Sequence, residues 1–157
     1  MFMISKKKAA FIMLIAVFFV ILDRFLKFLA VNRYFDEPVN LIGDIFKLNF
    51  IQNYNIAFSL PISGIGLNIV ISLILVGLLI GLIKLYKKGY LIIAYLVLVI
   101  ILGAASNLYD RINYGFVIDY LDLKYFTVFN LADVMIVGGV IGLGWLMIRN
   151  SNRELLR

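Results

Sequence analysis

The sequence contains no histidine and no cysteine, only two prolines, and few charged residues, 15% of the chain. Without histidine there can be no Ser-His-Asp triad, no Cys-His dyad and no His-Glu-x-x-His zinc site. Without cysteine there are no disulfides and no thiolate metal ligands. We therefore expect no bound metal and no cofactor, and we expect any hydrolytic chemistry to depend on carboxylates.

Long hydrophobic runs dominate what is present. Hydrophobic residues make up 64% of the chain, whereas soluble domains are roughly half apolar. A helix needs about 20 residues to cross the hydrocarbon core of a bilayer. Four stretches meet this requirement, at about 9–31, 65–83, 90–111 and 129–148. We therefore predict an α-helical integral membrane protein with four transmembrane helices, forming a single membrane domain over residues 1–157.

The fifteen basic residues are distributed unevenly around these stretches. Nine of them lie before the first stretch, between the second and third, or after the fourth, together with only one acid, Glu154. In a four-span protein these segments share one side of the membrane. The positive-inside rule places that side, with both termini, in the cytoplasm. The net charge of +6 is thus a topology signal, and no nucleic-acid partner is expected.

Two extracytoplasmic segments follow from this topology, at about 32–64 and 112–128. In the first, Phe46, Leu48 and Phe50 alternate with Lys47 and Asn49, which is the period of a β-strand. The stretches 53–60 and 116–123 are candidates for further strands of the same small sheet.

Polar residues recur near the outer ends of the apolar stretches, at spacings that place them on common helix faces. These sets are Asp23 with Lys27, Gly103 with Asn107 and Arg111, and Asn130 with Asp133. Amides and charges in hydrocarbon need partners, so we expect a buried polar cluster. A structural ion pair accounts for Asp23 and Lys27, and Asp133 or a backbone group is the expected partner of Asn107.

Asp119 and Asp133 are the candidate catalytic residues. Two carboxylates held close together cannot both ionise easily, so they share one proton. The ionised carboxylate can activate a water molecule, and the protonated one can hydrogen-bond the carbonyl that the water attacks. This is the chemistry of an intramembrane aspartic endopeptidase. The sequence alone leaves open whether these two aspartates meet, and Asp23, Asp110 and Asp122 are rivals on the same side.

The main alternative is a small ion- or proton-coupled membrane transporter, in which the same polar residues bind ions or relay protons. Transporters often contain internal repeats and helices interrupted at the bilayer midplane. This sequence has no internal repeat, and its polar residues gather at one side of the membrane instead of along a path across it.

Five motifs occur in order along the chain. Residues 23–27 have the form Asp-x-x-x-Lys; residues 53–59 are similar to Asn-x-Gly-Ala-Ala-Phe-Ser; residues 103–111 resemble Gly-Ala-x-Gly-Asn-x-x-Asp-Arg; residues 117–120 match Val-x-Asp-Phe; and residues 129–133 match Phe-Asn-x-Ala-Asp. With these motifs the chain resembles the signal peptidase II, or lipoprotein signal peptidase, family, and in motif order and number of spans the resemblance covers nearly the whole chain.

The resemblance implies an aspartic endopeptidase of the bacterial cytoplasmic (inner) membrane. It would remove the signal peptide from diacylglyceryl-modified prolipoproteins, cutting before the lipidated cysteine. The implied fold adds a small extracytoplasmic β-cradle and a short periplasmic helix to the four transmembrane helices. The implied partners are lipidated prolipoproteins, membrane lipid and globomycin-type peptide antibiotics, and we expect a monomer with its active site near the outer face.

The same resemblance assigns roles to individual residues. Asp119 and Asp133 match the catalytic pair. Supporting or substrate-binding positions are matched by Asp23, Lys27, Asn53, Gly103, Asn107, Arg111 and Asn130.

Three departures from the family motifs matter for the prediction. Asn55 and Ile56 replace a glycine and an alanine, and Ser106 replaces the glycine before Asn107. Asparagine tolerates positive φ, and Ser106 is small enough to keep helices packed closely. None of the three is one of the proposed catalytic aspartates, so we expect these departures to affect the fit of the substrate.

Overall fold

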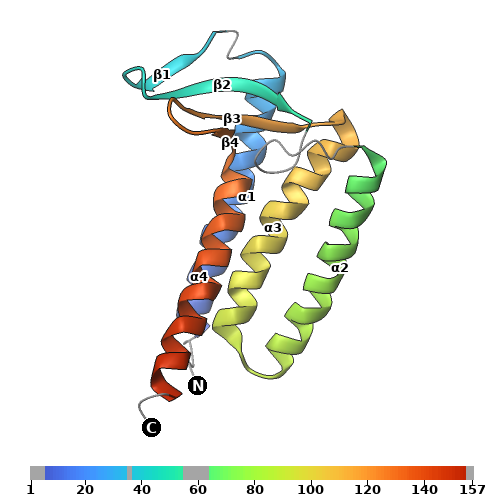
Figure 1. Cartoon of the computed structure of the whole chain (residues 1–157), viewed down its shortest axis with the longest axis vertical. Helices are drawn as coiled ribbons and strands as arrows, with labels where there is room; N and C mark the ends of the chain where they lie inside the picture. Colours follow the sequence, from blue (N-terminus) through green and yellow to red (C-terminus); the bar gives the residue numbers. More distant parts are fainter. Residues whose placement is uncertain (1–5, 35–36, 55–63, 155–157) are drawn as a thin grey trace.

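The computed structural model describes residues 6–34, 37–54 and 64–154. Its elements follow in the order α1 (Lys6–Val31), β1 (Val39–Ile42), β2 (Phe46–Asn53), α2 (Ile65–Lys87), α3 (Leu91–Tyr114), β3 (Val117–Leu123), β4 (Val128–Phe129) and α4 (Leu131–Glu154). The helices form an elongated bundle with the sheet across one end (Figure 1). The turn between α2 and α3, the start of α1 and the end of α4 all lie at the opposite end.

Each of the four predicted apolar stretches forms a helix. Within the described residues, three helical segments are long and apolar enough to cross a membrane: Ile65–Lys87, Leu91–Tyr114 and Leu131–Arg149. For α1 the comparison covers residues 11–31, where Asp23, Arg24 and Lys27 lie close together, and this part of the helix is not among the three. The fourth membrane span therefore stays a prediction.

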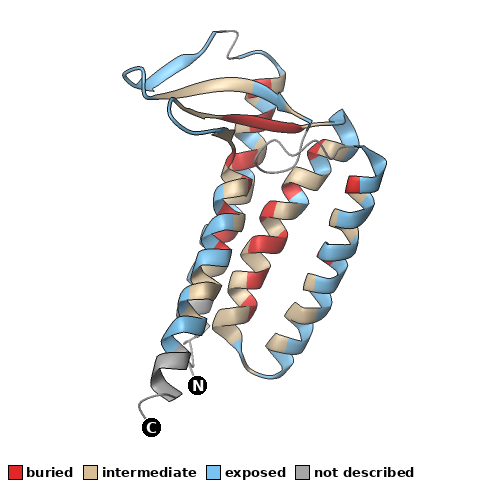
Figure 2. Ribbon diagram, viewed as in Figure 1, coloured by how far each residue is buried: buried red, intermediate tan, exposed pale blue. Residues whose placement is uncertain are grey.

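The bundle surface is apolar, as expected for helices that face lipid. Large side chains such as Leu14 on α1, Leu73 on α2 and Met147 on α4 are each about two-thirds exposed or more. Figure 2 shows that α2 is exposed along most of its length, whereas buried residues follow α3 and gather where the bundle meets the sheet. Helix α3 packs against α1, α2 and α4, which makes it the central helix.

The sheet has four antiparallel strands in the order β1-β2-β3-β4. The predicted alternation at residues 46–50 is confirmed as part of β2, and the candidate at 116–123 is confirmed as β3. The candidate strand at 53–60 is wrong at its start, because Asn53 ends β2; residues 55–60 lie outside the described part of the chain. The implied short periplasmic helix is not among the elements of residues 32–34, 37–54, 64 and 115–128.

Short connections hold the sheet against α3 and α4. Gly115 ends α3 with a positive φ of 81°, and its N–H donates to the carbonyl of Arg111; glycine adopts this left-handed conformation without steric cost. Strand β3 begins only two residues later, and β4 is separated from α4 by Asn130 alone. The sheet therefore lies next to the end of α3 and the start of α4.

Candidate active site

Asn130 connects the two candidate catalytic aspartates. Its side-chain Nδ2 donates a 2.7 Å hydrogen bond to Oδ1 of Asp119. Its backbone N–H donates to Oδ2 of Asp133 at 3.2 Å, and the N–H of Asp133 donates back to Oδ1 of Asn130 at 2.9 Å. This reciprocal pair has the geometry of a capping box at the start of α4. The predicted common face of Asn130 and Asp133 is confirmed, and Asp119 shares a direct partner with Asp133.

Asp119 is placed by the register of β2 and β3. Ile51 pairs with Asp119 and Asn53 pairs with Val117, so Asn53 lies diagonally across from Asp119, within reach of its side chain. Asn53 Nδ2 donates to Oδ2 of Asp119 at 2.8 Å. Burial, and after it the negative charge of Asp133, raises the pKa of Asp119 from 3.8 to about 7. Asp119 therefore carries a proton over much of the range below neutral pH.

Asp133 occupies the first turn of α4, where backbone N–H groups favour an anion. Its Oδ1 accepts a 2.7 Å hydrogen bond from Nδ2 of Asn107 on α3, which confirms the expected partner of Asn107. The approach of the two helices depends on Gly103, one turn before Asn107. A Cβ atom at this position would lie 2.5 Å from the carbonyl oxygen of Ala132, closer than atoms can pack.

Arg111 lies at the edge of this group. Its Nη1 donates to the carbonyl of Tyr54 at 3.4 Å, and its positive charge interacts with both Asp119 and Asp133. Arg111 thus places a cation beside the two carboxylates, at the point where the chain leaves β2.

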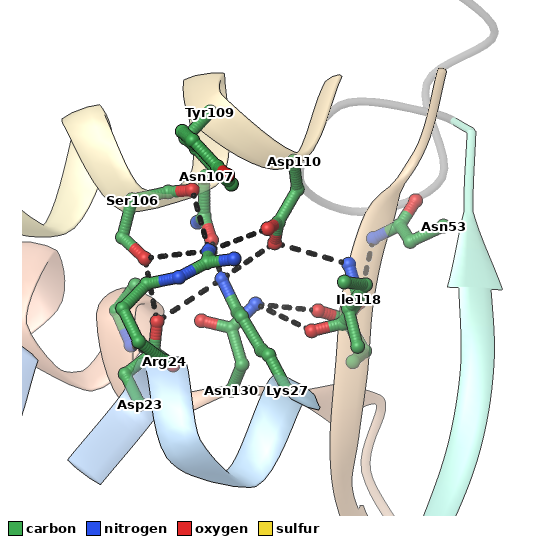
Figure 3. A network of polar contacts seen from close by, with 12 residues as sticks. Asp23, Arg24, Lys27, Asn53, Ser106, Asn107, Tyr109, Asp110, Ile118 and Asn130 are labelled. Carbon is green, nitrogen blue, oxygen red and sulfur yellow. Dashed lines mark hydrogen bonds and ion pairs between the residues drawn. The ribbon is translucent and has the colours of Figure 1, made fainter. Parts of the chain in front are cut away.

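A second cluster of charges supports the site from α1 (Figure 3), and all of its members except Arg24 are fully buried. Lys27 Nζ lies 3.1 Å from Oδ2 of Asp23 and 2.7 Å from Oδ2 of Asp110, and it donates to Oδ1 of Asn107 at 2.8 Å. Arg24 forms an ion pair with Asp110 and lies over the ring of Tyr109, 4.5 Å from its centroid. The expected ion pair of Asp23 with Lys27 is confirmed. The cluster balances two acids with two cations, which buried charges require.

Four members of this cluster were not among the nine predicted site residues: Arg24, Ser106, Asp110 and Tyr120. Ser106 Oγ donates to Oδ2 of Asp23 at 2.6 Å, and the Tyr120 hydroxyl donates to its Oδ1 at 2.9 Å. Burial raises the pKa of Tyr120, so this hydroxyl stays a donor. The sequence spacing could have indicated two of them, because Ser106 and Asp110 are four residues apart on α3 and so share a helix face.

The contacts of each aspartate distinguish the candidate catalytic pair from the rival aspartates. Asp23 and Asp110 are each paired with buried cations, and Asp122 accepts a 2.9 Å hydrogen bond from Asn49 away from Asn130. Among the aspartates of the described chain, Asp119 and Asp133 are the pair joined through Asn130. Of the nine predicted site residues, the hydrogen bonds and ion pairs connect seven into one network, Gly103 allows the helices to approach, and Arg111 lies beside both carboxylates.

Two solved structures with a similar architecture are described as bacterial membrane enzymes. One, described as a bacterial membrane enzyme at 2.3 Å resolution, superposes with a TM-score of 0.78 and 25% identity, covering 92% of each chain. A second, also described as a bacterial membrane enzyme, has a TM-score of 0.70 and 26% identity, covering 88% of this chain and 92% of that one. The fold and the buried polar site define this class: an enzyme embedded in a membrane.

The family follows from the sequence comparison. The model of the family described as "Signal peptidase (SPase) II" matches residues 15–149. The lipoprotein signal peptidase of Caldicellulosiruptor bescii is 38% identical over 135 residues, covering 86% of this chain and 89% of its own. That of Clostridioides difficile is 33% identical over 132 residues, covering 82% and 88%. The chain belongs to the signal peptidase II family and is a peptidase; the transporter alternative is not supported.

Proposed function

We propose that this peptidase is an aspartic endopeptidase that removes the signal peptide from diacylglyceryl-modified prolipoproteins, cutting before the lipidated cysteine. The observation that carries the proposal is the link between Asp119 and Asp133 through Asn130. It joins two carboxylates of which one, Asp119, has a pKa near neutrality. A dyad that shares one proton has this character.

The reaction assigns a different task to each carboxylate. Asp133, ionised, takes a proton from a water molecule, whose oxygen attacks the carbonyl carbon of the scissile amide. Asp119, protonated, donates a hydrogen bond to the carbonyl oxygen, where negative charge develops. Collapse of the tetrahedral intermediate breaks the C–N bond, and the proton that Asp133 received passes to the leaving amine. The remaining site residues hold these groups in place: Asp23, Lys27, Asn53, Gly103, Asn107, Arg111 and Asn130.

The membrane arrangement of the proposal has four spans in a single membrane domain of the bacterial inner membrane. Both termini and the α2–α3 turn lie in the cytoplasm, because the basic residues concentrate there. The sheet and the two aspartates then lie at the outer face, where a lipidated precursor presents its cysteine. A reporter fused at Lys87 would test this arrangement; activity characteristic of the outer side would contradict it.

The acyl chains of the substrate contribute binding energy in this proposal, at about 0.8 kcal/mol for each buried methylene. Globomycin-type peptide antibiotics are proposed to occupy the same site. We take the enzyme to act as a monomer in this proposal, because one chain supplies both aspartates and no second copy is needed to complete the pair.

One experiment tests the proposal as a whole. The purified protein in detergent is given a precursor that carries diacylglycerol on its cysteine, and the same precursor without the lipid. We expect cleavage of the lipidated precursor with a much higher kcat/KM, and loss of cleavage in folded Asp119→Asn and Asp133→Asn. Near-wild-type turnover by either variant would refute the dyad; equal kcat/KM for both precursors would refute lipid recognition.

A further inference from the structure

Asn107 depends on its neighbours for its orientation. The oxygen and nitrogen ends of a side-chain amide have nearly the same shape, so hydrogen-bond partners decide which end points where. Oδ1 of Asn107 faces Lys27 Nζ at 2.8 Å, and Nδ2 faces Oδ1 of Asp133 at 2.7 Å. An ammonium group can only donate. Lys27 therefore requires the oxygen end of the amide and directs the NH₂ end toward Asp133.

The other contacts of Lys27 fix the position of its ammonium group. Its ammonium group has three N–H donors and three oxygen neighbours: Asp23 at 3.1 Å, Asp110 at 2.7 Å and Asn107 at 2.8 Å. The side chain is fully buried, so no donor is left for water. Asp110 has a second cation in Arg24. Arg24 contacts Ser106 and Tyr109, and within the described part of the chain it forms no hydrogen bond or ion pair with Asn107, Asp119 or Asp133. The two cations thus share a carboxylate but differ in their connection to the dyad.

We propose that Lys27 is a positioning residue that acts through Asn107: by fixing the amide, it makes Asp133 a hydrogen-bond acceptor and so the base of the pair. If the amide were reversed, its oxygen would face Asp133, and only a protonated Asp133 could donate to it. The shared proton would then be on Asp133 instead of Asp119, and Asp133 could not act as the base. The inference rests on the proposed aspartic mechanism. It specifies which residues decide that Asp133 is the base and Asp119 the acid.

Other charges also act on Asp133 and would contribute to any pH effect. They come from each element packed around it: Asp23 and Lys27 on α1, Arg111 on α3, and Asp119 and Tyr120 on β3. A test must therefore separate the orientation of Asn107 from a general change of charge in this group.

The test compares Lys27→Met with Arg24→Gln. Each variant removes one cation from Asp110, but only Lys27→Met releases the amide of Asn107. The measurement is kcat and KM for a lipidated precursor as a function of pH. For Lys27→Met we expect the acid limb of kcat/KM to move up by about one pH unit, with about a tenfold loss at low pH that appears in kcat and not in KM. For Arg24→Gln we expect the acid limb at its wild-type position.

Two further variants serve as controls. One keeps the test readable if Lys27→Met does not fold, and the other distinguishes the orientation of Asn107 from a purely structural role of Lys27. Lys27→Met combined with Asp110→Asn keeps the buried cluster neutral, so its pH profile can be read if the single variant does not fold; we expect the same shift of the acid limb. Lys27→Arg keeps a cation that can only donate, and we expect it to keep the wild-type position of the limb. Equal shifts in Lys27→Met and Arg24→Gln, or no shift in the charge-balanced variant, would overturn the inference.

These outcomes are distinct from failure of the aspartic mechanism. If that mechanism is wrong, Asp119→Asn or Asp133→Asn retains turnover regardless of what happens at Lys27. If only the inference is wrong, both asparagine variants are inactive, while removal of Lys27 lowers activity equally at every pH.

Discussion

Ser106 Oγ donates a 2.6 Å hydrogen bond to Oδ2 of Asp23, and both residues are buried. This contact ties the middle of α3 to the last third of α1, across 83 positions of sequence. Asp23 also accepts from Tyr120 on β3 and from the backbone N–H of Ala132 on α4. One carboxylate thus joins three helices and the sheet. A glycine at position 106, as in the motif that residues 103–111 resemble, could not make this hydrogen bond.

Ser106→Ala is predicted to destabilise the protein by about 2 kcal/mol, the typical cost of removing a hydrogen bond to a charged group. The measurement is the free energy of unfolding in mixed detergent. Ser72→Ala is the matched control, because the Ser72 hydroxyl donates only to the carbonyl of Asn68 within α2; its effect should stay within about 0.5 kcal/mol. Equal effects of the two changes would show that the contact with Asp23 adds no stability.

Asp119→Asn is predicted to weaken the pH dependence of stability. The pKa of Asp119 is raised from 3.8 to about 7, so between these pH values the folded protein holds a proton that the unfolded chain has released. Stability therefore falls as the pH rises through this window. Asparagine does not titrate, so the loss of Tm between pH 4 and pH 7 should be smaller in the variant. A variant with the same pH dependence as the wild type would contradict the raised pKa.

Asn53→Ala is predicted to lower kcat/KM by roughly tenfold or more, because it removes a hydrogen bond to the Asp119 carboxyl. That bond lowers the pKa of Asp119, so its loss should move the alkaline limb of the pH profile to higher pH. Asn49→Ala is the control on the same strand, since Asn49 donates to Asp122 instead. If both changes shift the limb equally, the effect comes from the sheet and not from the contact with Asp119.

Gly103→Ala is predicted to cost about 1–3 kcal/mol, as overpacking of a tight contact does. The new Cβ would meet backbone at Ala132 and side chains at Ile136 and Met135, pushing α4 away from α3. The Asn107–Asp133 hydrogen bond should lengthen, and cleavage should fall with Tm. In Gly81→Ala the new Cβ meets nothing within 4 Å, so this change should leave cleavage intact and keep or raise Tm. Normal activity in Gly103→Ala would show that the helices can adjust.

The helices could be predicted closely because the information is local. Long apolar runs between short polar segments leave helices as the way to satisfy the backbone in a membrane. The ends of α3 and α4 are also local features: Gly115 closes one helix, and the Asn130–Asp133 pair begins the other. The pairing of the strands in the sheet was harder to predict from the sequence. Where β2 ends, and where its register shifts between Leu48 and Ile51, depends on contacts with β3, far along the chain.

The sequence by itself determined the membrane character of this protein, the chemistry left open by the absence of histidine and cysteine, and the short-range pairs Asp23–Lys27 and Asn130–Asp133. Only the tertiary structure decided which aspartates belong together. Asn53 and Asp119 are 66 residues apart, and Lys27 and Asn107 are 80 apart. Such contacts depend on strand register and on how closely helices pack, which a repeating local pattern does not encode. Their partners then distinguish the aspartates, because a buried carboxylate needs a counter-charge or hydrogen-bond donors: Asp23 and Asp110 are paired with Lys27 and Arg24, whereas Asp119 and Asp133 are joined through Asn130.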